Sequence, residues 1–205
     1  MKKQYLLLIA ICSFFMANAQ DKGEFEYGFF AGVNVSNIST LDNEDASSSR
    51  VGLNVGAYGE YYFSDRWSVR ANLNYDQKGW KDTFTIFDEM DSESFKTNFA
   101  LNYLTVPVLA NWHFAKNRNW YLNVGPYAGF LLNAEVTENG LDISDGFNGT
   151  DFGLAFGIGV KIPINKENQI FIEYGAQSGF SDIFEDNQGE TVRNGRSSIN
   201  IGFTF

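Results

Sequence analysis

The pattern on which this chain is organised is clearest in residues 51–78, VGLNVGAYGEYYF-SDR-WSVRANLNYDQK. On both sides of its central SDR, apolar side chains alternate with residues that are mostly polar or glycine, and Gly59 is the exceptional glycine on the apolar face. Alternation with period 2 over runs this long indicates β-strands that have one apolar and one polar face. A three-residue turn places Phe63 opposite Trp67, and therefore Glu60 opposite Arg70 on the polar face. The stretch predicts a long β-hairpin, but it does not say which face meets water.

The same alternation recurs along the chain, so that eight strands are predicted and no stretch of helical period competes with them. The further strands are residues 27–36, 100–114, 120–134, 152–164, 170–179 and 197–205. Short connections (64–66, 115–119, 165–169) alternate with long polar ones (37–50, 79–98, 135–151, 180–195). All short turns then lie at one end, together with both termini. This asymmetry is typical of an outer-membrane barrel with short periplasmic turns and long external loops.

Three features indicate that the apolar face meets lipid. No charged side chain falls on that face, where it would cost about 2–4 kcal/mol at the bilayer midplane. Aromatic residues gather towards both strand ends as two girdles, with Trp67, Trp112 and Trp120 beside the short turns and Trp80 at the other end. Strand glycines fall mostly on the polar face, and the interior of an eight-stranded barrel is narrow. The prediction is an all-β, eight-stranded antiparallel up-and-down transmembrane β-barrel.

Residues 1–19 have the pattern of a cleaved signal peptide, which leaves residues 20–205 as the barrel domain. Lys2 and Lys3 precede an apolar stretch, and Ala17-Asn18-Ala19 forms an A-x-A cleavage site. The single cysteine, Cys12, lies in the apolar stretch, so the mature chain is predicted to have no disulfide and no thiol chemistry.

The charge of the chain excludes some classes of partner. Without Lys2 and Lys3 there are 13 basic and 25 acidic residues, a net charge of −12. This excess of acid argues against nucleic acid as a partner and against a polybasic attachment to membrane surfaces.

The sequence resembles the PorT-like outer-membrane β-barrel proteins of Bacteroidota, whose architecture is similar to the OmpA-like eight-stranded barrel. The segments that carry the resemblance are 29–38 (FFAGVNVSNI), 62–79 (YFSDRWSVRANLNYDQKG), 103–110 (YLTVPVLA), 121–129 (YLNVGPYAG) and 199–205 (INIGFTF). The resemblance implies location in the outer membrane of a Gram-negative bacterium. One branch of this family is linked to type IX secretion, but no residue places the chain in that branch.

The polar face contains candidate lumen ion pairs. Glu60 is expected to face Arg70 across the first hairpin, and a five-residue turn at 165–169 pairs Lys161 with Glu173. One interpretation is an ionic gate that conducts ions. The other, which we favour, is a structural network that fills the barrel, because a buried ion must be paired and an unpaired one costs several kcal/mol.

Catalytic and metal chemistry find little support in the sequence, and we predict no enzyme activity, no cofactor and no metal centre. His113, the only histidine, is expected to point inward beside a short turn, opposite Tyr121. A barrel esterase needs a His–Ser pair near the lipid face at the outer end. A metal centre needs several ligands, and there is no second histidine.

The expected partners are outer-membrane lipid, the barrel-insertion machinery during assembly, and an envelope or extracellular protein at the acidic long loops. The loop acids are Asp42, Glu44, Asp45, Asp88, Glu89, Asp91, Glu93, Asp142, Asp145, Asp151, Asp182, Glu185, Asp186 and Glu190. Divalent cations are an alternative partner for these carboxylates. The terminal aromatics Phe203 and Phe205 resemble the signal that the insertion machinery reads.

The predicted function is therefore that of a small, monomeric, non-enzymatic outer-membrane barrel with a plugged lumen and a structural or adhesive role. A secretion-linked barrel that binds other envelope proteins is one alternative. A soluble periplasmic lipid carrier of the lipocalin kind is another, and it requires an apolar interior, so that the two faces of every strand are exchanged.

Overall fold

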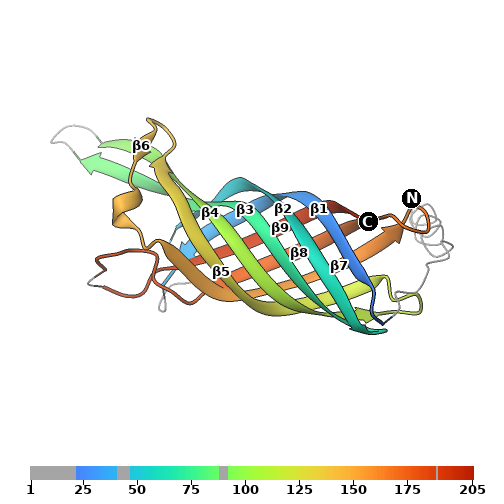
Figure 1. Cartoon of the computed structure of the whole chain (residues 1–205). Coiled ribbons are helices and arrows are strands. Elements are labelled where there is room, and N and C mark those ends of the chain that lie inside the picture. Colours follow the sequence, from blue (N-terminus) through green and yellow to red (C-terminus); the bar gives the residue numbers. More distant parts are fainter. Residues whose placement is uncertain (1–21, 41–46, 88–91, 188) are drawn as a thin grey trace, which may run out of the picture.

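The computed structural model describes residues 22–40, 47–87, 92–187 and 189–205, and within them the chain forms a closed antiparallel barrel (Figure 1). Each strand pairs with the next, and the last returns to pair with the first. The eight barrel strands are β1 (Phe25–Ser39), β2 (Ser48–Ser64), β3 (Trp67–Phe87), β4 (Ser92–Phe114), β5 (Trp120–Val136), β7 (Thr150–Pro163), β8 (Gln169–Gly179) and β9 (Arg193–Thr204). The predicted eight-stranded fold is confirmed.

The remaining elements lie in the connection between β5 and β7. They are the two-residue strand β6 (Leu141–Asp142), which pairs with the end of β5, and the 3-10 helix η1 (Ser144–Gly146). Among the described residues, no helix is both long and apolar enough to cross a membrane.

Burial alternates along the central part of the barrel strands and assigns the two faces. On β2, the apolar Leu53 and Val55 are exposed on the outside, whereas Asn54 and Glu60 are buried inside. A polar interior and an apolar exterior are the arrangement of a transmembrane barrel. The lipocalin alternative required the opposite arrangement and is therefore wrong.

The first hairpin has the predicted central register but a different turn. Glu60 lies opposite Arg70 as expected. The predicted pair of Phe63 with Trp67 is wrong, because Ser64 is the partner of Trp67 and the register shifts by one residue between Tyr62 and Ser64. A bulge next to a tighter turn thus replaces the three-residue turn, and it leaves the central pairs where a three-residue turn would put them.

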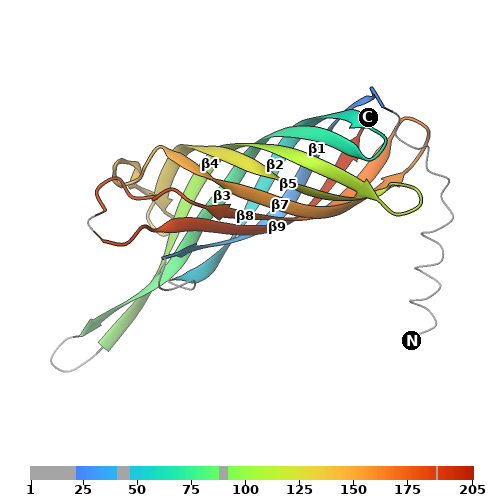
Figure 2. The same ribbon diagram turned by 90° about the horizontal axis from the view of Figure 1, so that it is seen from below.

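At the opposite end, the hairpin of β3 and β4 projects well beyond the other strands (Figure 2). The prediction of a loop over residues 79–98 is wrong there, because strand pairing continues to Phe87 and Ser92. The sequence DTFTIF at residues 82–87 is rich in β-branched and aromatic residues, which favour strands.

A register shift interrupts the pairing of β2 with β3 near the long-loop end. The partners of Ser49 and Asn54 on β3 differ by one residue from a continuous ladder, so the extra residue lies on β2. The alternation of β3 itself is unchanged up to Trp80, and its pairing with β4 is continuous past Gly79, which has a positive φ of 125°. Trp80 follows the inward Asp76 and Lys78 on the same face and is only 5% exposed, so its assignment to the outer aromatic girdle is wrong.

Pro107 interrupts the pairing of β4 with β3. The partnered positions jump from Val108 to Thr105 without a change in register. Since proline has no N–H to donate, the gap is the local consequence of this residue in a closed sheet.

Candidate functional site: the polar lumen and its two closed ends

Lys161 on β7 is the centre of an ionic cluster at the short-turn end of the lumen. Its Nζ donates to Glu60 Oε2 at 2.8 Å, to the Tyr62 hydroxyl at 2.7 Å and to Glu26 Oε2. Glu60 Oε1 also accepts from Asn111 Nδ2 at 2.9 Å. The ammonium group and Glu60 are buried, and each charged group of the cluster has an oppositely charged partner, as buried ions require, whereas the neutral Asn111 Oδ1 has no partner.

A second ion pair lies one layer deeper. Arg70 Nη1 is 3.1 Å from Glu173 Oε2, and the same carboxylate oxygen accepts from the Tyr121 hydroxyl and from Asn123 Nδ2. The Arg70 guanidinium carbon lies 3.9 Å from the centre of the Tyr58 ring, a cation–π contact.

Inward glycines make room for these bulky side chains. A Cβ on Gly28 would meet the Tyr58 ring, and a Cβ on Gly159 would collide with the Tyr121 ring. The concentration of glycine on the polar face thus allows large aromatic and cationic side chains inside a narrow barrel.

The four residues predicted to form lumen ion pairs all lie in ion pairs, but their partners are exchanged. Arg70 contacts Glu173 and Lys161 contacts Glu60. The predicted register of Lys161 with Glu173 is wrong, because Lys161 is opposite Phe171. Both contacts cross the lumen between strands that are not hydrogen-bonded neighbours, and hairpin register identifies only neighbours.

His113 lies inside the barrel opposite Tyr121, as predicted. The sequence analysis missed its neighbour Ser68, whose Oγ is 3.1 Å from His113 Nε2. The same Nε2 is 3.0 Å from Glu60 Oε1, while Nδ1 has no partner. A catalytic triad uses one ring nitrogen for serine and the other for the carboxylate. All three side chains are also fully buried, so this group does not have the geometry of an esterase.

Two more ion pairs, which the sequence analysis did not identify, occupy the lumen towards the long loops. Arg196 Nη1 is 3.0 Å from Asp76 Oδ1, and Lys78 Nζ is 2.8 Å from Asp151 Oδ2. Asp151 was predicted to be an exposed loop acid and is instead fully buried. Lys78 lies on the same face of β3 as Arg70, and Arg196 lies on the same face of β9 as Ser198. The period-2 pattern was therefore sufficient to predict that both cations point inward.

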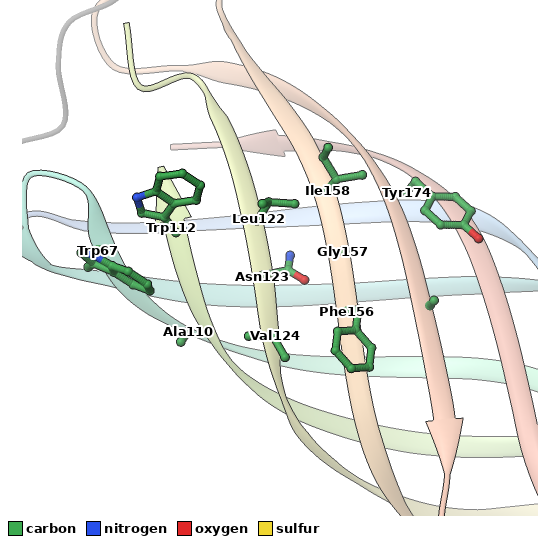
Figure 3. A pocket seen from close by; sticks show the side chains of 11 residues that line it. Trp67, Ala110, Trp112, Leu122, Asn123, Val124, Phe156, Gly157, Ile158 and Tyr174 are labelled. Atoms are coloured by element: carbon green, nitrogen blue, oxygen red, sulfur yellow. The ribbon is translucent and has the colours of Figure 1, made fainter. Parts of the chain in front are cut away.

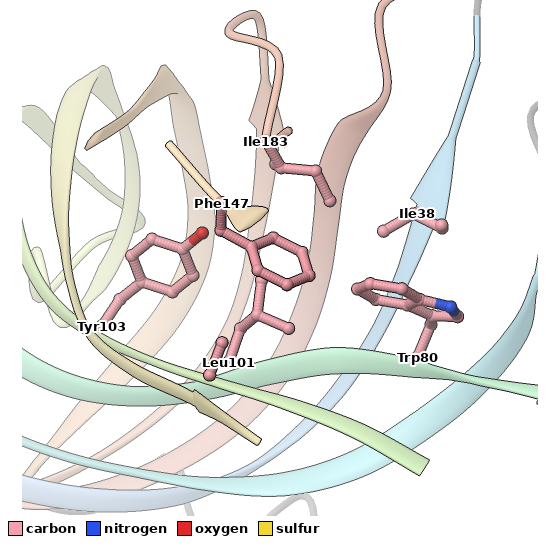
Figure 4. Packing of buried hydrophobic residues seen from close by; sticks show 7 residues of the cluster. Ile38, Trp80, Leu101, Tyr103, Phe147 and Ile183 are labelled. Atoms are coloured by element: carbon pink, nitrogen blue, oxygen red, sulfur yellow. The ribbon is translucent and has the colours of Figure 1, made fainter. Parts of the chain in front are cut away.

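An apolar cluster closes the lumen at the long-loop end (Figure 4). Its buried members come from strands and from two loops, and are Ile38, Trp80, Leu101, Tyr103, Ala134, Phe147 and Ile183. Phe147 belongs to the β5–β7 loop and Ile183 to the β8–β9 loop, where Ile183 is only 1% exposed. We call this group the apolar plug.

The two loops that contribute to the apolar plug are joined to each other. The backbone N–H of Asn148 donates to Ile183 O at 2.8 Å, and its Nδ2 donates to the carbonyls of Asp182 and Phe184 at 3.0 and 2.8 Å. Glu185 N donates to Gly146 O at 3.2 Å. The loops therefore form one hydrogen-bonded unit above the barrel.

The remaining loop acids have different environments. Asp182 accepts from the backbone N–H groups of Phe184 and Val192 and thus holds its own loop. Asp145 and Asp186 are exposed. Asp142 accepts from the Ser144 N–H, and its hydrogen bonds to Ser144 lower the pKa of this carboxyl. Within the described residues, no group of three or more His, Cys, Asp or Glu has metal-binding geometry.

The other predicted loop acids lie where no side chain is described. Asp42, Glu44, Asp45, Asp88, Glu89 and Asp91 lie outside the described residues, and the side chain of Glu93 is not described. The predicted signal peptide, residues 1–19, with Cys12, also lies outside them.

The outer wall beside the short turns contains a series of aromatic contacts. Trp67 and Trp112 have ring centres 6.5 Å apart, and Phe114 links Trp112 to Trp120. Next to them lies an apolar hollow of about 590 Å³ (Figure 3), where the small side chains of Ala110 and Ala176 stand among larger ones. In a membrane this wall faces acyl chains.

The terminal aromatics also lie near the short turns. Phe205 is exposed, stacks on Tyr27 with ring centres 5.4 Å apart and contacts Phe203. Their role as an insertion signal stays a prediction.

Together, the closed strand order, the polar lumen and the apolar wall define a transmembrane β-barrel. Residues 17–185 match the family of outer membrane protein β-barrel domains, and the chain belongs to this family. It is an outer-membrane β-barrel protein. Its assignment to the PorT-like branch stays a prediction.

Two solved structures are similar to this chain. Neisserial surface protein A is 18% identical with a TM-score of 0.50, over 86% of this chain and 95% of that one. OprG from Pseudomonas aeruginosa is 14% identical with a TM-score of 0.49, over 92% of this chain and 99% of that one. At 18% identity, the similarity to Neisserial surface protein A indicates the fold alone. A search of curated proteins finds no match.

Proposed function

We propose that this protein is a sealed, non-enzymatic outer-membrane barrel that serves as a structural and adhesive element through the surface of its long loops. The observation that carries the proposal is closure of the lumen at both ends. Lys161 with its carboxylates fills the short-turn end, and the apolar plug fills the long-loop end. An interior filled in this way favours a scaffold over a porin channel.

The joined loops support a contact role. Asn148 fixes the β5–β7 loop to the β8–β9 loop, and the exposed carboxylates of Asp145 and Asp186 lie on the two loops. A rigid surface loses little conformational entropy on binding, which favours recognition of a partner with complementary positive charge.

Planar-bilayer recording tests the sealed lumen. The purified wild-type protein is expected to show no steady conductance. Glu60→Ala and Arg70→Ala are expected to lower thermal stability because each leaves a buried charge unpaired. Lys166→Ala, in an exposed turn, is the control and is expected to leave thermal stability unchanged. A steady conductance of the wild type contradicts the proposal, as does conductance of either variant at unchanged stability.

Site-specific cross-linking on intact cells tests the contact role. Since Cys12 is the only cysteine and is predicted to be removed, single cysteines can carry the cross-linker. Asp145→Cys and Asp186→Cys are expected to trap a partner, and Lys166→Cys at the short-turn end is the control. Equal capture at all three sites, or none at the loop sites, contradicts a contact role of the loops.

The secretion-linked alternative rests on the PorT-like resemblance and differs in its partners. Pull-down of the detergent-solubilised protein distinguishes the secretion-linked barrel from the structural and adhesive one, because only a secretion-linked barrel is expected to bring other envelope proteins with it. We further propose export with cleavage after Ala19 in a Gram-negative host of the Bacteroidota. Mass determination of the mature chain tests the cleavage and should find Gln20 as its first residue.

A further inference from the structure

A polar pocket of about 420 Å³ lies at the long-loop rim, where β1, β8 and β9 meet. Its lining residues are Asn37, Ser39, Thr40, Ser178, Gly179, Phe180 and Arg193. The strand register explains this grouping, since Ser39 is opposite Arg193 and Ser178 is opposite Gly195. The pocket is distinct from the lumen network and from the apolar plug.

The pocket opens on the outer side of the barrel. Arg193 occupies the same face of β9 as Ile199, which is exposed on the apolar wall. Ser39 likewise continues the outward positions of Val35 on β1, and Ser178 is exposed on β8. Towards the rim, this wall therefore changes from aliphatic side chains to hydroxyls, an amide and a guanidinium. In a membrane, the aliphatic part of the wall would face acyl chains and the polar part would face lipid headgroups.

Arg193 differs from the cations inside the barrel. Arg70, Lys78, Lys161 and Arg196 all have carboxylate partners. No carboxylate of the described residues forms an ion pair with Arg193. Its Nε is buried without a hydrogen-bond acceptor, as are Arg70 Nη2 and Arg196 Nε, but those two guanidinium groups have a carboxylate to balance their charge. A buried donor without a partner is destabilising, and an oxyanion in the pocket would satisfy it.

We propose that this pocket binds the phosphate group of an anionic lipid in the outer leaflet. The Arg193 guanidinium is the charged donor, because its planar fork matches two phosphate oxygens. Ser39, Ser178 and Asn37 supply further donors, and the acyl chains lie along the aliphatic wall of Val35 and Ile199.

Native mass spectrometry of the detergent-refolded protein tests the proposal with three probes: phosphatidylglycerol, phosphatidylcholine with the same acyl chains, and inorganic phosphate. The wild type is expected to retain one phosphatidylglycerol preferentially. Arg193→Gln should weaken this binding by about tenfold or more, the loss typical of a hydrogen bond to a charged group. Lys96→Gln, which removes an exposed cation at the same end, is the matched control and should bind as the wild type does.

Ser178→Leu is a second variant that keeps the cation but fills the pocket from an exposed position, and it should weaken binding as well. Heat-modifiable gel mobility verifies that each variant is folded, and Ser178→Leu decides the test if Arg193→Gln does not fold. Unchanged retention in the folded variants overturns the proposal, and so does equal retention of phosphatidylcholine. Inorganic phosphate that binds as tightly as the lipid overturns the lipid assignment, because the site then takes free anions.

Discussion

The two ends of the lumen are closed by opposite chemistry. At the short-turn end, the groups around Lys161 are two carboxylates and a tyrosine hydroxyl, and all come from strands, whose register fixes them. At the long-loop end, the apolar plug combines strand residues such as Trp80 with Phe147 and Ile183 from loops. Strands therefore position buried ions accurately, whereas loops are held by apolar contact, which is not directional.

The two chemistries should respond differently to substitution. Removing one member of a buried ionic cluster leaves its partners charged and unpaired, so that the loss of stability is large. Removing part of an apolar cluster costs in proportion to the area and cavity involved. The following substitutions test this contrast, beginning with the ionic end.

Lys161→Met should have the largest effect. It leaves Glu26 and Glu60 as neighbouring buried carboxylates without their cation. The free energy of unfolding is expected to fall by about 3–5 kcal/mol. Urea unfolding in lipid vesicles measures it, and Lys166→Met in the exposed turn nearby is the control, with an expected change within about 0.5 kcal/mol. Similar losses for both variants would show that the cluster contributes little to stability.

Ile183→Ala tests the apolar end. The side chain is almost completely buried in the apolar plug, so the substitution should lower the free energy of unfolding by about 2–3 kcal/mol. Ile164→Ala is the matched control, because Ile164 is exposed in a short turn. Hydrogen exchange should locate the loss in the β5–β7 and β8–β9 loops. Destabilisation that reaches the short-turn end equally would mean that the two ends are not independent.

The fold was predictable from the sequence because period-2 alternation is a local property. The same alternation placed Glu60, Arg70, Lys161 and Glu173 inside the barrel. Their true partners were not predictable, since both contacts cross the lumen. The strands that face each other across a barrel are determined by the number of strands and by the shear. The register of a single hairpin gives neither quantity.

The other differences between sequence and structure lie at strand ends. Trp80 shares the face of the inward Asp76 and Lys78, so the alternation itself places it inside, and it was assigned to the outer girdle only because aromatic residues gather near that strand end. Asp151 was assigned to a loop because it precedes the alternating residues of its strand, yet β7 begins at Thr150. Errors of one or two residues at strand ends are thus sufficient to move a charge from the surface to the interior.

A double-mutant cycle tests the exchanged partners directly. Arg70→Gln and Glu173→Gln should be coupled by about 1–2 kcal/mol because the two side chains are in contact. The matched cycle of Arg70→Gln with Glu60→Gln should give a smaller coupling energy, although these residues are opposite each other on neighbouring strands. A larger coupling energy for the second cycle would support the pairing inferred from hairpin register and would contradict the cross-lumen contact.

Asn148→Ala should have the smallest effect and separates the loops from the barrel. It removes the two side-chain hydrogen bonds to the β8–β9 loop, each worth about 1 kcal/mol. Global unfolding should change little, since the backbone bond from Asn148 to Ile183 remains. Hydrogen exchange should increase in both loops. Asn187→Ala is the control, because the Asn187 amide donates only within its own loop, to Asp182 and Glu190, and its loss should affect the β8–β9 loop alone. If both variants perturb one loop only, the loops are not joined as a unit, and the apolar plug must be stabilised by the strand residues beneath it.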